Sequence, residues 1–287
     1  MNKKLSKIAL DILGIILALI CLSPFYIIIV NSFKTKGELF ESTLALPEKF
    51  NLDNYTRAWE QLDFIKVLGN SLFITVISIV FIVLFASMAA WMLQRTNSKI
   101  SNMILFIFIS SMLVTFQSIM LPLINIMGKL NLLNVPGIIF MYIGFGSASA
   151  IFLYHGFVKS IPKELDEAAL IDGCSKWQTF RYIIFPLLKP ISITVAILNT
   201  VWIWNDFLLP SLVINQAGTR TIPLSMFFFF GQYTKQWDLA LAGLVLTIIP
   251  VLIFYFFAQK HIIKSVTVGS INKYRIKIQH LKVYKSN

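Results

Sequence analysis

Residues 159–190 read KSIPKELDEAALIDGCSKWQTFRYIIFPLLKP, a polar stretch between the fourth and fifth long apolar runs of the chain. Its spacing predicts two short helices. Ser160 is placed to cap the first helix, Pro162 suits its opening turn, and Gly173 supplies the left-handed residue that ends it. Leu165, Ala168, Ala169 and Asp172 recur at helical spacing. One narrow face of small residues therefore lets another surface approach the helix backbone closely.

The second helix of this stretch has its own start and stop signals. Ser175 and Gln178 have the spacing of a capping box, and Pro186 and Pro190 are expected to stop the helix. Both helices are too polar and too short to cross a membrane. We therefore predict a helical hairpin outside the bilayer.

The remainder of the chain is strongly apolar. Of 287 residues, 57% are hydrophobic, and the mean hydropathy is +0.75. The apolar residues form continuous runs long enough to cross a bilayer as helices, and they do not alternate with polar residues as in a barrel strand. We therefore predict an all-α integral membrane protein with six transmembrane helices. The expected spans cover about 9–33, 68–93, 103–122, 136–158, 191–214 and 238–258.

The distribution of charge predicts the topology. With the amino terminus in the cytoplasm, 17 Lys and Arg residues lie in inside segments and 8 in outside segments. The positive-inside rule then places both termini and residues 159–190 in the cytoplasm. The net charge of +12 fits anionic lipid headgroups, so no nucleic-acid partner is needed. A basic tail, 274–287, follows a transmembrane domain over residues 1–273, and the sequence leaves open whether the tail is solvated, binds lipid or touches a partner.

Several motifs resemble those of a known transporter family. Glu167-Ala168-Ala169, Asp172-Gly173, Phe180 and Pro186 resemble the EAA loop of permease subunits of ABC importers. Weaker patches in the same order along residues 5–273, such as Ala89–Arg95, resemble the carbohydrate-importing type that includes the maltose and multiple-sugar systems. The resemblance implies the type I importer permease fold. It also implies a cytoplasmic coupling helix with these ATPase-coupling residues: Glu164, Glu167, Ala168, Ala169, Asp172, Gly173, Phe180 and Pro186. The alternative is an ordinary amphipathic hairpin on the membrane surface.

The same resemblance implies the partners. They are a second homologous permease subunit, a cytoplasmic ATPase dimer that binds ATP and Mg, and an external sugar-binding protein. None of the thirteen glycines begins the Gly-x-x-x-x-Gly-Lys-Ser/Thr loop that cradles nucleotide phosphates. We therefore expect a transport subunit without enzymatic chemistry, and without cofactor or metal of its own.

Polar residues in and near the fifth run are candidates for the substrate pathway. Asp206 lies in an apolar run, where a carboxylate is costly unless it faces a partner, a cavity or the outer interface. Small residues from Gly144 to Ala150 in the fourth run are expected to serve helix packing first. The pathway candidates are Asn199, Trp204, Asn205, Asp206 and Gln232.

Three other functions stay open at this point. The chain is equally compatible with an ABC permease for another solute, such as a glycerol phosphate. A secondary transporter coupled to ions through Asp206 also fits six spans without a nucleotide loop. A membrane scaffold or sensor would bind partners without flux.

Overall fold

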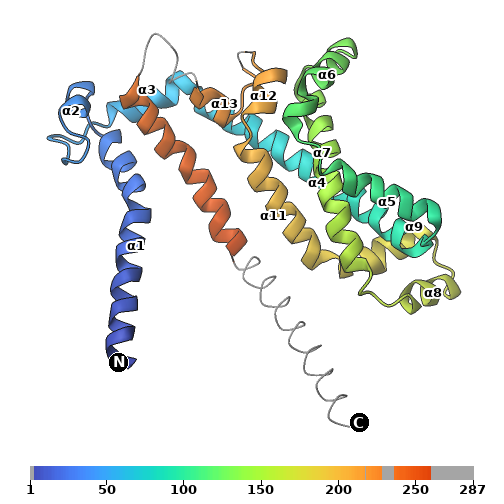
Figure 1. The fold of residues 1–287 in the computed structure, drawn as a ribbon. Coiled ribbons are helices and arrows are strands. Elements are labelled where there is room, and N and C mark those ends of the chain that lie inside the picture. Colours follow the sequence, from blue (N-terminus) through green and yellow to red (C-terminus); the bar gives the residue numbers. More distant parts are fainter. Residues whose placement is uncertain (1–2, 217, 228–235, 260–287) are drawn as a thin grey trace. The chain divides into compact units, whose positions relative to one another are not determined.

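The computed structural model describes residues 3–216, 218–227 and 236–259, and the regular elements among them are all helical (Figure 1). Gln232 and the basic tail lie outside these residues. These described residues divide into two compact units, one made by those within 1–68 and 221–253 and the other by those within 69–220 and 254–259. The helices are α1 (Lys3–Ser32), α2 (Lys36–Glu41), α3 (Asp53–Leu62), α4 (Phe64–Thr96), α5 (Lys99–Ser111), α6 (Phe116–Lys129), α7 (Val135–Val158), α8 (Glu164–Ile171), α9 (Lys176–Gln178), a π-helical segment (Thr179–Ile184), α10 (Phe185–Leu187), α11 (Lys189–Asn205), α12 (Leu208–Val213), α13 (Ile222–Phe227) and Trp237–Gln259.

In the first unit, a polar cluster holds the segment that follows α1. The side-chain amide of Asn54 donates to the carbonyl oxygens of Ser32 and Lys34, at 3.0 and 2.8 Å. The buried Lys34 ammonium donates to the carbonyl of Ser42 at 2.8 Å. These bonds satisfy buried polar groups where the backbone leaves α1. The short helices α2 and α3 follow in the chain, between the apolar spans of α1 and α4.

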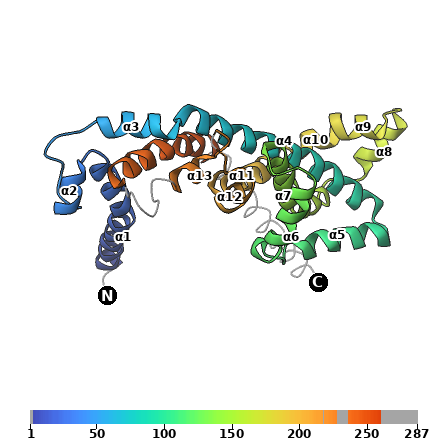
Figure 2. The ribbon, with the colours of Figure 1, turned by 90° about the horizontal axis from the view of Figure 1, so that it is seen from above.

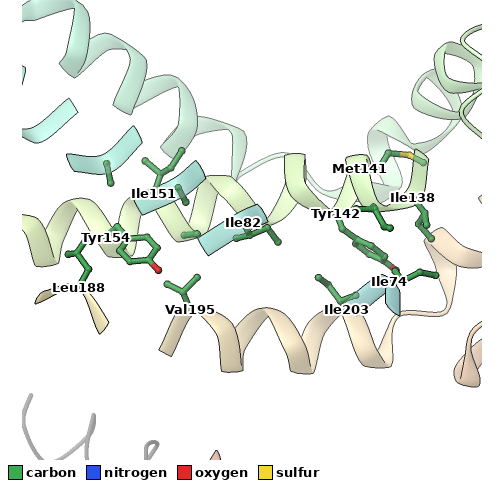
Figure 3. Packing of buried hydrophobic residues seen from close by; sticks show 14 of the residues in the cluster. Ile74, Ile82, Ile138, Met141, Tyr142, Ile151, Tyr154, Leu188, Val195 and Ile203 are labelled. Carbon is green, nitrogen blue, oxygen red and sulfur yellow. The ribbon is translucent and has the colours of Figure 1, made fainter. Parts of the chain in front are cut away.

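Helices α4, α7 and α11, labelled in Figures 1 and 2, contribute buried residues to the core of the second unit. Figure 3 shows Ile74 and Ile82 of α4 and Val195 of α11 around the face of α7. A Cβ added at Gly146 of α7 would lie 2.5 Å from Cδ1 of Ile82 and 2.7 Å from Oδ1 of Asn199. The small residues of the fourth run therefore allow close helix packing, as predicted.

Among the described residues, four helices are long and apolar enough to cross a membrane unbroken: residues 10–32, 64–96, 135–158 and 237–259. Two bent pairs bring the total to as many as six if each pair counts as one span. Lys99–Ser111 and Phe116–Lys129 meet at 104°, and Lys176–Leu187 and Lys189–Asn205 meet at 75°.

Two of the expected spans are therefore interrupted. The helix within 103–122 is broken, because the backbone leaves the helix between α5 and α6 and is extended at Thr115. The span predicted over 191–214 ends at Asn205, and Asp206 is extended with ψ 128°. The Asp206 carboxylate accepts the N–H of Leu208 at 3.0 Å, a local bond that replaces helical backbone bonding at this point.

Candidate functional site

Helix α8 begins without the side-chain cap that the sequence predicts. The hydroxyl of Ser160 donates to the carbonyl of Phe157 in the last turn of α7, so the predicted cap is wrong. Lys163 occupies the N-cap position and makes no capping hydrogen bond. Glu164, Asp166 and Glu167 all lie in the first turn, where negative charge favours the positive end of the helix dipole.

The end of α8 is confirmed as predicted. Gly173 has φ +82°, the left-handed region that glycine enters without a Cβ penalty. The Gly173 N–H donates to the carbonyl of Leu170 at 3.1 Å, and the Cys174 N–H donates to that of Ala169 at 2.9 Å. This pair of bonds is the Schellman motif, which satisfies the last carbonyls and turns the chain sharply.

The second half of the hairpin is partly as predicted. The capping box of Ser175 and Gln178 is present. The helical run then passes through the π-helical segment, in which the Phe185 N–H donates to the carbonyl of Phe180. The run bends at Leu188, where α11 begins. Pro186 lies within α10 and Pro190 in the first turn of α11, so the prolines lie on either side of the bend and do not stop the helix themselves.

A clasp of three side chains, Trp91 and Arg95 of α4 with Asp166 of α8, fixes the hairpin to the end of α4. The Trp91 indole N–H donates to Oδ1 of Asp166 at 2.8 Å, and an Arg95 guanidinium nitrogen lies 2.8 Å from Oδ2. Arg95 also donates to the carbonyl of Ile161 at 3.1 Å. Charge-assisted bonds of this kind are among the stronger protein hydrogen bonds.

Asp166 was not among the predicted site residues, although Trp91 and Arg95 lie within one of the family-like patches. The sequence did contain a signal for this contact. Trp91 and Arg95 lie one helical turn apart at the end of an apolar run and need hydrogen-bonding partners, and the loop that follows the fourth run contains several acidic residues. The sequence alone does not say which acid is the partner.

An aromatic cluster supports the clasp from the other side. The Phe180 ring is 1% exposed and lies 5.6 Å from the Trp91 ring, 6.0 Å from that of Trp177 and 5.7 Å from that of Phe185 between centroids. The π-helical segment begins immediately before Phe180, and wider helical turns of this kind redirect side chains. The cluster therefore packs α4 against both halves of the hairpin.

The outer face of α8 is open. Ile171 is 86% exposed, and Leu170 and Trp177 are about half exposed. Of the predicted coupling residues, Ala169 and Phe180 are buried and hold the hairpin from within. The others are exposed: Glu164, Glu167, Ala168, Asp172, Gly173 and Pro186.

The predicted pathway residues do not converge on one place. Asn199 is buried, donates to the carbonyl of Val195 at 2.9 Å and packs against Gly146, so it is a packing residue. Asn205 is exposed and donates to the carbonyl of Val201. Trp204 is half-buried, and Gln232 lies outside the described residues.

Asp206 does line a cleft of about 810 Å³ in the second unit. Tyr142 donates its hydroxyl to Oδ2 of Asp206 at 2.9 Å, and the ring of Trp202 lies edge to face with that of Tyr142 at 5.5 Å. Tyr142 was not among the predicted residues, because only the packing of α7 against α11 brings it to Asp206. Trp202 lies four residues before Asp206 along the chain.

The matches to known proteins agree with this geometry. Residues 82–268 match the family described as "Binding-protein-dependent transport system inner membrane component". The chain belongs to this family. As a permease of this family it is a multi-pass component of the inner membrane, and its role is transport.

Two curated relatives and one solved structure cover nearly the whole permease. It is 53% identical over 267 residues to a probable starch degradation products transport system permease protein, AmyC, of Thermoanaerobacterium thermosulfurigenes, covering 93% of this chain and 97% of that one. It is 38% identical over 260 residues to the multiple sugar-binding transport system permease protein MsmG of Streptococcus mutans, covering 88% and 92%. A bacterial ABC transporter involved in import of the acidic polysaccharide alginate contains a chain that superposes with TM-score 0.77 at 25% identity, covering 91% of this chain and 98% of that chain.

Proposed function

We propose that this permease is one of two membrane subunits of an ATP-driven importer for a neutral oligosaccharide. The names of its relatives support the substrate class, since they include starch degradation products and multiple sugars. The observation that carries the mechanism is the clasp of Trp91, Arg95 and Asp166 with the exposed tip of α8 beyond it. A helix that is held firmly on one side and exposes Leu170 and Ile171 on its open side is suited to dock into a separate protein.

The partner proposed for this face is a cytoplasmic ATPase dimer that binds ATP and Mg. The excess of Lys and Arg around the hairpin and after residue 258 supports a cytoplasmic position for the hairpin and for both termini. An external sugar-binding protein and a second, homologous permease subunit complete the importer. Exposed Ile171, Ala168 and Asp172 are the residues proposed to meet the ATPase.

The hairpin follows α7 directly through residues 159–163, and it connects to the other membrane helices in two further ways. The clasp joins α8 to the end of α4, and α9, the π-helical segment and α10 lead through one bend into α11. Closure of the ATPase dimer against α8 would therefore displace α4 and α11 together. Because α7 packs between them, such a rigid movement changes the walls of any path beside α7 and α11.

The test is reconstitution of the permease with the second permease, the ATPase and the binding protein in proteoliposomes. A panel of maltotriose, raffinose and arabinotriose is offered, and we expect at least one to stimulate ATP hydrolysis and to enter the vesicles only with ATP. Uptake of glycerol phosphate but of no sugar would overturn the substrate class. Uptake by this chain alone, driven by a proton or sodium gradient and lost in Asp206→Asn, would overturn the ATP-driven mechanism.

A further inference from the structure

Two interrupted helices open onto the cleft that Asp206 lines. Met112 and Val114, between α5 and α6, form one side of its wall. Asp206, between α11 and α12, forms another side together with Leu208 at the start of α12. Irregular backbone at membrane depth is tolerated where it is buried in protein or faces a water-filled cavity, and it is not found against lipid. Two such breaks in the wall of a single cleft indicate that the cleft holds water.

Asp206 is the acidic residue in the wall of this cleft, and protein hydrogen bonds hold both its carboxylate oxygens in place. Oδ2 accepts from the Tyr142 hydroxyl and Oδ1 from the Leu208 N–H, so each oxygen retains a further lone pair. Among the described residues, no Lys or Arg side chain forms an ion pair with Asp206. An oriented acceptor without a neighbouring cation is suited to the hydroxyl groups of an uncharged ligand.

The rest of the wall combines aromatic and small polar groups. The side chain of Trp202 is 41% exposed and lies on the same wall as Asp206. Gln117 near the start of α6 and Ser149 of α7 add an amide and a hydroxyl. Sugar rings present apolar C–H faces and polar hydroxyl edges, so a wall of aromatic rings with a few polar groups matches their chemistry.

The position along the helices fits a path across the membrane. Asp206 follows Lys189 by about 25 Å of helix, at 1.5 Å per residue. A hydrocarbon core is about 30 Å thick, so a cleft at this height lies in the half of the membrane away from the hairpin. With the hairpin in the cytoplasm, the cleft lies toward the outer side, where sugar enters.

We propose that this cleft is a sugar-contacting section of the translocation path. Asp206 accepts hydroxyl groups of the passing oligosaccharide, Trp202 contacts a ring face, and Tyr142 is a positioning residue that orients the Asp206 carboxylate. This inference rests on the proposed function, since it names the contacts of the sugar that the importer carries.

Thiol labelling tests the cleft with a matched pair of small changes. Cys21 and Cys174 are free, so both are first replaced by Ser in the assembled importer. Ser149→Cys then places a thiol on the cleft wall, whereas Ser147→Cys, two residues away on α7, places one off that wall. A small water-soluble methanethiosulfonate should label Cys at 149, and the transported sugar with its binding protein should slow that labelling several-fold. Labelling at 147 should be slow and insensitive to sugar. Equal labelling of both, or no protection at 149, would overturn the cleft as a sugar site.

Transport kinetics provide a second, independent test. Trp202→Leu should raise the half-saturating concentration for uptake about tenfold, whereas Trp204→Leu, a matched change at a residue that does not line the cleft, should leave it unchanged. Tyr142→Phe and Asp206→Asn should each raise it, and the double variant should be no worse than Asp206→Asn alone. Equal effects at 202 and 204, or additive effects at 142 and 206, contradict the assignment.

The two proposals fail in different ways. If the wild-type importer carries none of the sugars offered, the proposed function fails. If it carries one but the labelling and kinetic pairs show no difference, only the cleft assignment fails. Size-exclusion chromatography of each assembled complex separates a loss of contact from a failure to fold.

Discussion

The guanidinium of Arg95 lies 2.8 Å from the carboxylate of Asp166, and this ion pair joins the end of α4 to α8. Both side chains are largely buried, at 13% and 14% exposed. Trp91 bonds the other oxygen of the same carboxylate, so Asp166 meets two partners from one helix. These two contacts with α4 thus fix the position of α8, whose outer face stays exposed.

Asp166→Asn should destabilise the attachment of the hairpin. It removes the charge that Arg95 meets and leaves a buried guanidinium poorly satisfied, which costs about 1 to 3 kcal/mol of unfolding free energy. We expect a lower melting temperature of the purified complex and weaker stimulation of ATP hydrolysis by the loaded binding protein.

Trp91→Phe is the matched partner for this experiment, because it removes the N–H and keeps a ring against Phe180. In a double-mutant cycle with Asp166→Asn, the two changes should be clearly non-additive. Strict additivity in both melting temperature and stimulated hydrolysis would show that the two side chains do not act together.

The loss caused by a substitution at Gly173 should depend on how readily the new residue adopts a left-handed backbone conformation. An added Cβ meets no atom within 4 Å, so the cost arises from φ +82° and not from a clash. Gly173→Asn should be mildest, Gly173→Ala should cost about 1 to 2 kcal/mol, and Gly173→Val should be worst because it is also β-branched. Co-purification of the ATPase and stimulated hydrolysis should fall in that order. Normal docking and turnover in Gly173→Val would contradict the role of this turn.

Ile171→Ser should weaken ATPase binding without loss of permease stability. The side chain is 86% exposed, so its removal leaves no cavity, and an apolar interface contact of this kind is worth about 1 to 2 kcal/mol, roughly a tenfold loss of affinity. Surface plasmon resonance of the permease pair against the ATPase measures the affinity.

Ala169→Leu is the contrasting change within α8. Ala169 is buried beneath the helix, so a larger side chain should lower the melting temperature. If Ile171→Ser lowered the melting temperature and left affinity intact, the outer face of α8 would not be the docking surface.

Gly146→Ala should destabilise the core of the second unit by about 1 to 3 kcal/mol, because the added methyl overlaps Ile82 and Asn199. Gly144→Ala is the control, since a Cβ there meets nothing within 4 Å and should leave thermal stability unchanged. Ile82→Val in the Gly146→Ala background removes the closest atom and should restore some of the loss. Equal melting temperatures for the 144 and 146 variants would refute the close contact.

The sequence predicts some features of this permease well because they depend on near neighbours. Gly173 ends α8 and Ser175 pairs with Gln178, since a glycine turn and a capping box involve residues three or four apart. The span predictions over 103–122 and 191–214 do not include the break that each helix contains, because hydropathy stays high across it. Hydropathy averaged over a window of residues does not reveal the extended backbone at Thr115 or Asp206.

Composition and local spacing by themselves determined a helical membrane protein, a polar helical stretch over 159–178 and its glycine turn, because each follows from transfer free energy or from bonds within a few residues. Only the tertiary structure decided that Asp166 is the acid that meets Arg95 and Trp91, and that Tyr142 orients Asp206. Those pairs lie far apart along the chain, and the packing of α4, α7 and α11 selects them from several chemically equivalent candidates.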